Sequence, residues 1–224
     1  MPQKKNKKVF IYIFFFLFFG TINNYTIFYS NLFKIKSFNV SGLDNNFKKE
    51  IESKLYDLKQ SNIFYIDKIL LTSVLNSNSL IEKFNILKIY PSTLNIKIKK
   101  TNFLAKLNID GDIFLIGSNG KLTKDFMSSN SKKLPFIFGN LNVDDFLKTY
   151  SIINTSGFKY EDIKNLYFYK SGRIDVKLNN DILLKLPIDN FQYILKNISQ
   201  LLSDNQFKKK IIDARVPKQL ILYD

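Results

Sequence analysis

The sequence predicts an α+β protein with one N-terminal transmembrane helix, a small β-α-α-β-β domain, and a mostly antiparallel β domain that has a C-terminal helix and a terminal edge strand. Three observations predict it. An uncharged apolar stretch follows a lysine cluster, two helical patterns then lie between strand-like runs, and later strand-like runs are separated by turn residues. The expected divisions are a tail (1–8), a transmembrane helix (9–29), the small domain (35–102) and the β domain (103–224).

The N-terminal stretch has the charge pattern of a membrane anchor. Four lysines occur within the first eight residues, and the next charge is Lys34. At 1.5 Å per residue a helix needs about 20 residues to cross a bilayer, which Val9–Tyr29 provides. A cleaved signal peptide is the alternative, but no small-x-small cleavage site follows. We expect a retained anchor with a cytoplasmic N-terminus and an exported C-terminal part.

The composition argues against catalysis. The 224 residues contain no cysteine and no histidine, so disulfides, thiolate metal sites and thiol nucleophiles are excluded. We therefore expect no enzyme activity, no cofactor and no metal. One might nominate Ser118 and Lys121 beside "GSNG" as a Ser/Lys pair, but that tetrapeptide is typical of a hairpin turn.

The net charge of +15 does not indicate a nucleic-acid partner. Lysine accounts for nearly all of the basic residues, as a general compositional bias would produce. Arginine, which reads bases and phosphates in a bidentate way, occurs only at Arg173 and Arg215. The stretch "YFYKSGRIDVK" could stack bases, but the preceding apolar segment argues against that role.

The small domain begins with "FNVSG" and continues with two helical patterns. The first has apolar residues at Phe47, Ile51, Leu55 and Leu58, the spacing of one helix face. The second is capped by Asp67 and is apolar at the following positions: Leu70, Leu71, Val74 and Leu75.

The stretch "NILKIYPSTLNIKIKK" predicts a hairpin that closes the small domain. Leu94, Ile96 and Ile98 alternate with polar residues, so they should face the two helices. Pro91 fits the turn, where its missing N–H breaks no ladder. The alternating lysines predict a solvated face, with a binding patch as the alternative.

After Asn102, strand-like runs are joined by Asp-Gly, Asn-Gly, Ser-Gly and Asn-Asn turns, which are typical of hairpins. Two helical patterns interrupt them, at 143–151 and 190–203. The last run, "VPKQLILYD", should form the edge strand.

These residues and their order resemble the bacterial cell division family FtsQ, called DivIB in some lineages. The resemblance rests on "FNVSG", on an N-x-F-x-x-D entry to the second helix, on "YPSTLNIKI", on "LPFIFG" and on "IDARVP". It implies that the small domain is a POTRA domain. It also implies a non-enzymatic scaffold of the inner membrane at the division septum, which links early and late division proteins and helps to control septal peptidoglycan synthesis.

The resemblance further implies partners and site residues. The partners would be an FtsB/FtsL-like subcomplex, with FtsK, FtsW and FtsI-like proteins as further candidates. Structural roles would fall to Gly42, Pro91, Asp213 and Arg215. The terminal strand would bind the partner by strand addition, with pairing limited to its later half by Pro217, although these residues could also simply complete the core. The expected partner-binding residues are Val216, Pro217, Lys218, Gln219, Leu220, Ile221, Leu222 and Tyr223. A different membrane-anchored POTRA scaffold for assembly or export is the alternative function.

Overall fold

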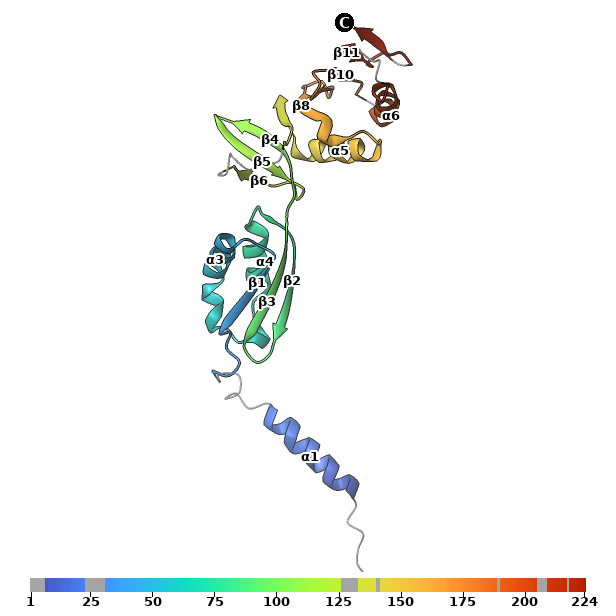
Figure 1. Cartoon of the computed structure of the whole chain (residues 1–224). Helices are drawn as coiled ribbons and strands as arrows, with labels where there is room; N and C mark the ends of the chain where they lie inside the picture. Colours follow the sequence, from blue (N-terminus) through green and yellow to red (C-terminus); the bar gives the residue numbers. More distant parts are fainter. Residues whose placement is uncertain are drawn as a thin grey trace, which may run out of the picture. The chain divides into compact units, whose positions relative to one another are not determined.

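The computed structural model describes residues 7–22, 31–125, 133–139, 142–188, 190–204, 209–216 and 218–224. The chain divides into two compact units, Met1–Lys100 and Thr101–Asp224. Figure 1 shows the elements of both, and each unit is described by itself.

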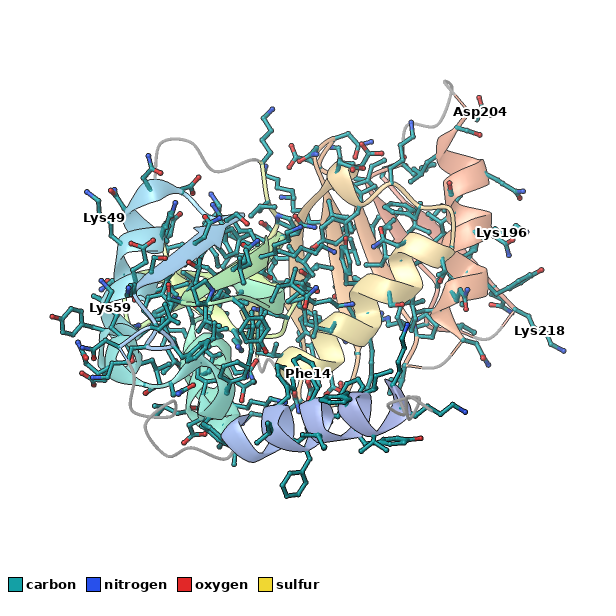
Figure 2. All side chains as sticks on the ribbon, turned by 90° about the horizontal axis from the view of Figure 1, so that it is seen from below. Phe14, Lys49, Lys59, Lys196, Asp204 and Lys218 are labelled. Atoms are coloured by element: carbon teal, nitrogen blue, oxygen red, sulfur yellow. The ribbon has the colours of Figure 1, made fainter. Side chains whose placement is uncertain are left out.

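The first described element is helix α1 (Lys7–Ile22), which has 16 residues. Its side chains from Lys7 to Gly20 are exposed, and aromatic rings such as Phe14 project from it (Figure 2). Within the described part of the chain, no helix has both the length and the apolar character needed to cross a membrane. The predicted transmembrane helix over 9–29 is therefore not confirmed, and residues 23–29 lie outside the described residues.

The first unit contains a three-stranded sheet with the order β1-β3-β2, in which β1 is parallel to β3 and β2 is antiparallel to it. The predicted β-α-α-β-β order is confirmed. The elements are β1 (Ser37–Ser41), α3 (Asn45–Lys54), η1 (Tyr56–Gln60), η2 (Ile63–Tyr65), α4 (Lys68–Ser77), β2 (Ile81–Ile89) and β3 (Thr93–Lys100).

The core of this unit lies between one face of the sheet and the two helices, which cover the same face (Figure 1). Leu94, Ile96 and Ile98 alternate along β3 and are all buried, as predicted. Lys97 and Lys99, on the opposite face, are exposed. The predicted turn also holds Pro91, which is exposed between β2 and β3.

The two helical patterns differ from the prediction in detail. The first helix ends at Lys54, and the 3-10 turn η1 carries Leu58 into the core. Asp67 caps α4 by accepting hydrogen bonds from the N–H groups of Ile69 and Leu70 at 2.8 and 3.1 Å. Leu70 was expected on the apolar face, but it is 45% exposed, because the buried stripe of this short helix consists of Leu71 and Leu75.

Gly42 directly follows β1, at a point where the backbone approaches β3 closely. Its φ is +95°, and a Cβ at this position would lie 1.8 Å from the carbonyl oxygen of Ile98. Only glycine fits both the left-handed backbone and this contact.

The second unit contains a nine-stranded sheet with the order β12-β11-β10-β9-β8-β7-β4-β5-β6. Two helices, α5 (Val143–Thr155) and α6 (Phe191–Leu202), interrupt the strands where helical patterns were predicted. The 3-10 turn η3 (Tyr160–Asp162) follows α5. The strands are β4 (Phe103–Ile109), β5 (Asp112–Gly117), β6 (Leu122–Lys124), β7 (Phe136–Gly139), β8 (Ile163–Phe168), β9 (Ile174–Leu178), β10 (Leu183–Leu186), β11 (Ile211–Asp213) and β12 (Ile221–Tyr223).

The sheet is mostly antiparallel, as predicted, but it includes three parallel pairs that hairpin chemistry alone does not predict. The pairs β7–β8 and β10–β11 are parallel because α5 and α6 provide the crossover connections. The third parallel pair is β4–β7. Buried side chains from both helices pack with Val176, Leu184 and Ile212, which pair across β9, β10 and β11 and so share one face.

A candidate partner-binding edge and groove

Strand β12 forms one edge of the nine-stranded sheet. It pairs antiparallel with β11, with Ile211 opposite Tyr223 and Asp213 opposite Ile221. Among the described residues no strand lies on its other side, and Figure 1 shows this last arrow of the chain next to β11. An edge strand presents free main-chain N–H and C=O groups that can pair with another chain.

The edge is more apolar than solvated edges usually are. Leu222 is 39% exposed and Tyr223 is 46% exposed. Proteins commonly protect such edges with charged residues, proline or a covering segment. Leu222 and Tyr223 therefore leave apolar surface exposed at this edge.

The predicted binding segment is only partly a strand. The N–H of Gln219 donates to the carbonyl oxygen of Val216 at 3.2 Å, and Lys218 has a φ of +64°. This left-handed residue interrupts the extended backbone, so the strand begins at Ile221 and is shorter than predicted. Pro217 lies outside the described residues.

A groove of about 880 Å³, here called the α6 groove, lies beside this turn. Its apolar lining includes Ile188, Tyr193 and Leu220, which are 58%, 70% and 41% exposed. Of the predicted binding residues, Val216, Lys218, Gln219 and Leu220 line it. Lys218, which lines the groove, projects outward (Figure 2) and places a positive charge on this surface. The groove is large enough to accept apolar side chains of another molecule.

An ion pair fixes the start of the loop between β11 and β12. Asp213 is buried, and its Oδ1 accepts hydrogen bonds from the backbone N–H of Arg215 at 3.1 Å and from the Nε of Arg215 at 2.8 Å. The second carboxylate oxygen contacts the terminal guanidinium. These bonds hold the pKa of Asp213 below its usual value, and the same pairing raises the pKa of Arg215.

A second arginine lines the groove from the β8–β9 turn. The Nε of Arg173 lies 3.2 Å from the Oδ1 of Asp175, which is buried, and its guanidinium lies 3.9 Å from the centre of the Tyr169 ring. Asp175 also accepts a hydrogen bond from the Tyr169 hydroxyl at 3.2 Å. In the sheet register, Lys185 of β10 lies opposite both Asp175 of β9 and Asp213 of β11. The two aspartates of the ion pairs therefore lie in one row across the sheet.

The sequence prediction missed the α6 wall of the groove and Arg173. Tyr193 lies outside the buried stripe of α6, which consists of Phe191, Leu195 and Ile198. One signal was available: the chain has only two arginines, Arg173 and Arg215, and both line this groove.

The Ser/Lys pair considered in the sequence lies in a hairpin turn. Ser118 and Lys121 belong to the turn between β5 and β6, where the N–H of Gly117 donates to the carbonyl oxygen of Lys121 at 3.0 Å. Within the part of the chain that the structure describes, no cluster of Asp or Glu could hold a metal ion.

Two family models match the two units of the chain separately. Residues 33–100 match the family "POTRA domain, FtsQ-type", and residues 105–215 match "Cell division protein FtsQ/DivIB, C-terminal". The cell division protein FtsQ of Bradyrhizobium diazoefficiens is 22% identical over 173 residues, which cover 73% of this chain and 48% of that protein. The chain thus spans about half the length of this relative.

A solved structure of the major extracytoplasmic domain of DivIB from Geobacillus stearothermophilus is also similar. It is 14% identical with a TM-score of 0.35, and the match covers 48% of this chain and 98% of that one. The two family matches together extend from residue 33 to residue 215, with a short gap between them. On these matches, the chain belongs to the FtsQ/DivIB family of bacterial cell division proteins.

Proposed function

We propose that this protein is a non-enzymatic, bitopic scaffold of the division complex that links early and late division proteins and helps to control septal peptidoglycan synthesis. The observation that carries the proposal is the free, apolar edge of β12 beside the α6 groove. Membership of a cell division family supplies the cellular context.

The scaffold is anchored in the inner membrane by residues 9–29, with the tail (1–8) in the cytoplasm. The lysine cluster within the first eight residues and the aromatic and aliphatic residues of α1 support this topology. The POTRA domain (35–102) and the β domain (103–224) then lie in the periplasm, and the protein concentrates at the septum.

The partner is an FtsB/FtsL-like subcomplex that adds a strand to β12. Main-chain hydrogen bonds along the edge would supply affinity, while the α6 groove would receive apolar side chains and so supply specificity. In this arrangement Val216, Lys218, Gln219 and Leu220 contact the partner in the groove, and Ile221–Tyr223 pair with it.

Co-purification of the full-length protein with the FtsB/FtsL-like partner tests this proposal. Deletion of Leu220–Asp224 should abolish recovery of the partner while the protein remains at the membrane. The matched control is Tyr56→Lys, since Tyr56 is an exposed aromatic residue of the POTRA domain. A truncated protein that recovers the partner at full yield would refute the edge-strand proposal, and a fluorescent fusion that stays away from mid-cell would refute the divisome role.

A further inference from the structure

One end of the POTRA domain gathers exposed aromatic side chains around the β2–β3 turn. The rings of Phe33 and Phe64 lie 5.2 Å apart, and Tyr90 stacks on Phe64 at 4.9 Å. Tyr65, which follows Phe64 directly, is 65% exposed. Phe33, Phe64, Tyr65 and Tyr90 are here called the aromatic pole.

Main-chain hydrogen bonds fix the three segments that form the pole. The N–H of Ile63 donates to the carbonyl oxygen of Phe33 at 2.9 Å. The N–H of Lys36 donates to the carbonyl oxygen of Ser92, also at 2.9 Å. The side chain of Asn62 accepts from the N–H of Phe64 at 2.9 Å. Ordered backbone therefore holds Phe64, Tyr65 and Tyr90 in exposed positions, while Phe33 packs partly against the core.

The charge around the pole is positive. The segments 31–36, 61–70 and 86–93 contain Lys34, Lys36, Lys68 and Lys88, whereas their one acidic residue, Asp67, caps α4. The Nζ of Lys88 donates to the carbonyl oxygen of Phe64 at 3.2 Å, which places this lysine beside the rings. Aromatic rings with adjacent lysines match the interface of an anionic bilayer, where rings lie at headgroup level and ammonium groups meet phosphates.

Chain connectivity places the pole at the end of the POTRA domain that the anchor reaches first. Helix α1 ends at Ile22, and Phe33 follows 11 residues later, a distance of at most about 40 Å even when fully extended. Strand β1 then runs away from the pole, from Ser37 beside Thr93 to Ser41 beside Lys97. A bilayer that holds α1 is thus within reach of the pole before any other part of the domain.

We propose that the aromatic pole docks on the lipid interface of the membrane that holds α1, with Phe64, Tyr65 and Tyr90 at headgroup level and the lysines against lipid phosphates. This inference rests on the proposed anchoring of the chain. Docking would fix the orientation of the POTRA domain on the membrane surface and so limit the positions that its partners must reach.

The absence of tryptophan from the chain provides a direct test. Full-length variants with a single tryptophan are reconstituted into vesicles of phosphatidylglycerol and phosphatidylcholine, with and without lipids brominated near the top of the acyl chain. Tyr90→Trp reports the pole, and Phe14→Trp reports α1. Asn46→Trp, on an exposed position of α3 near the opposite end of β1, is the matched control.

We expect bromine to quench Tyr90→Trp and Phe14→Trp strongly and to leave Asn46→Trp unchanged. Quenching of Phe14→Trp without quenching of Tyr90→Trp would overturn the docking inference and preserve the anchor. Quenching of Tyr90→Trp alone would support docking and refute the anchor. Equal quenching of Tyr90→Trp and Asn46→Trp would overturn docking through a defined pole.

A charge reversal then tests the role of the lysines. The double variant Lys36→Glu with Lys68→Glu should lose most of the quenching of Tyr90→Trp in vesicles that contain phosphatidylglycerol. The control pair, Lys97→Glu with Lys99→Glu, changes the charge equally on the exposed face of β3 and should retain it. If both pairs lose quenching alike, general charge and not the pole attracts the membrane, and the inference fails.

Discussion

The guanidinium of Arg215 holds the buried carboxylate of Asp213 in a bidentate pair, with Nε 2.8 Å from Oδ1. Asp213 is also the residue of β11 that lies opposite Ile221 of β12. The pair therefore stabilises the point where the chain leaves β11 for the loop that lines the α6 groove. It links a motif visible in the sequence, "IDAR", to the geometry of the candidate site.

The pair should make the stability of the β domain depend on pH. Because hydrogen bonds from Arg215 lower the folded-state pKa of Asp213, its contribution is fully present above the unfolded pKa of about 3.9 and is lost as the pH falls through the lower folded value. Asp213→Asn should cost about 1 to 2 kcal/mol at neutral pH. Urea-dependent pulse proteolysis of the full-length protein measures this difference.

The difference between the wild type and Asp213→Asn should shrink as the pH falls below about 4, where the unfolded-state carboxylate begins to gain its proton, and should be lost below the lower folded-state pKa. Asp144→Asn is the control, because Asp144 lies in the exposed first turn of α5. A difference at Asp213 that stays constant at all pH values would contradict the ionic role of the pair.

The alternation of buried and exposed residues along β3 predicts unequal losses of stability at neighbouring positions. Ile96 is fully buried against the helices, so Ile96→Asp should destabilise the POTRA domain by several kcal/mol, a large share of a total of roughly 5 to 15 kcal/mol. Lys97→Asp changes an exposed position and should have a small effect. Thermal unfolding of the two variants compares them directly, and equal melting temperatures would show that the assignment of faces is wrong.

Gly42 should tolerate alanine less well than Gly111 does. Both have a strongly positive φ, +95° and +90°, so both variants carry the backbone penalty of about 1 to 2 kcal/mol. Only at Gly42 would the new Cβ collide with the carbonyl oxygen of Ile98, whereas no atom lies within 4 Å at Gly111. Denaturation should show the larger loss for Gly42→Ala, and equal losses would mean that β1 can move away from β3.

The proposed topology predicts that the two ends of the chain lie on opposite sides of the membrane. Reporter fusions after Lys8 and after Asp224 should show a cytoplasmic and a periplasmic location, because the lysine cluster precedes the apolar stretch. A mature protein that begins near residue 30 would contradict the retained anchor and support a cleaved signal peptide.

The POTRA domain could be predicted almost completely from the sequence. Its strands alternate buried and exposed residues, its second helix has an aspartate cap, and its hairpin contains a proline at the turn. These are local signals, and each reports the environment of a side chain directly. The early end of the first helix was missed because Leu55 and Leu58 continue the helical spacing, although η1 carries Leu58 in a tighter turn.

The β domain was predicted less completely because its topology depends on non-local pairings. Hairpin turns indicate antiparallel neighbours, but nothing local shows that α5 returns the chain parallel to β7, or that α6 returns it parallel to β10. The α6 groove combines Arg173, Tyr193 and Leu220 from three distant segments. The last strand was predicted from its apolar run, Leu220–Tyr223, and among the described residues it lies at the edge of the sheet.

Site-specific photocrosslinking tests the central proposal most directly. A photoreactive phenylalanine analogue replaces Tyr223, on the free edge, in the full-length protein in dividing cells, and the same analogue at Tyr56 is the control. We expect position 223 to form a crosslink to the FtsB-like subunit and position 56 to form none. Robust crosslinking from position 56 with none from position 223 would contradict partner binding at the β12 edge.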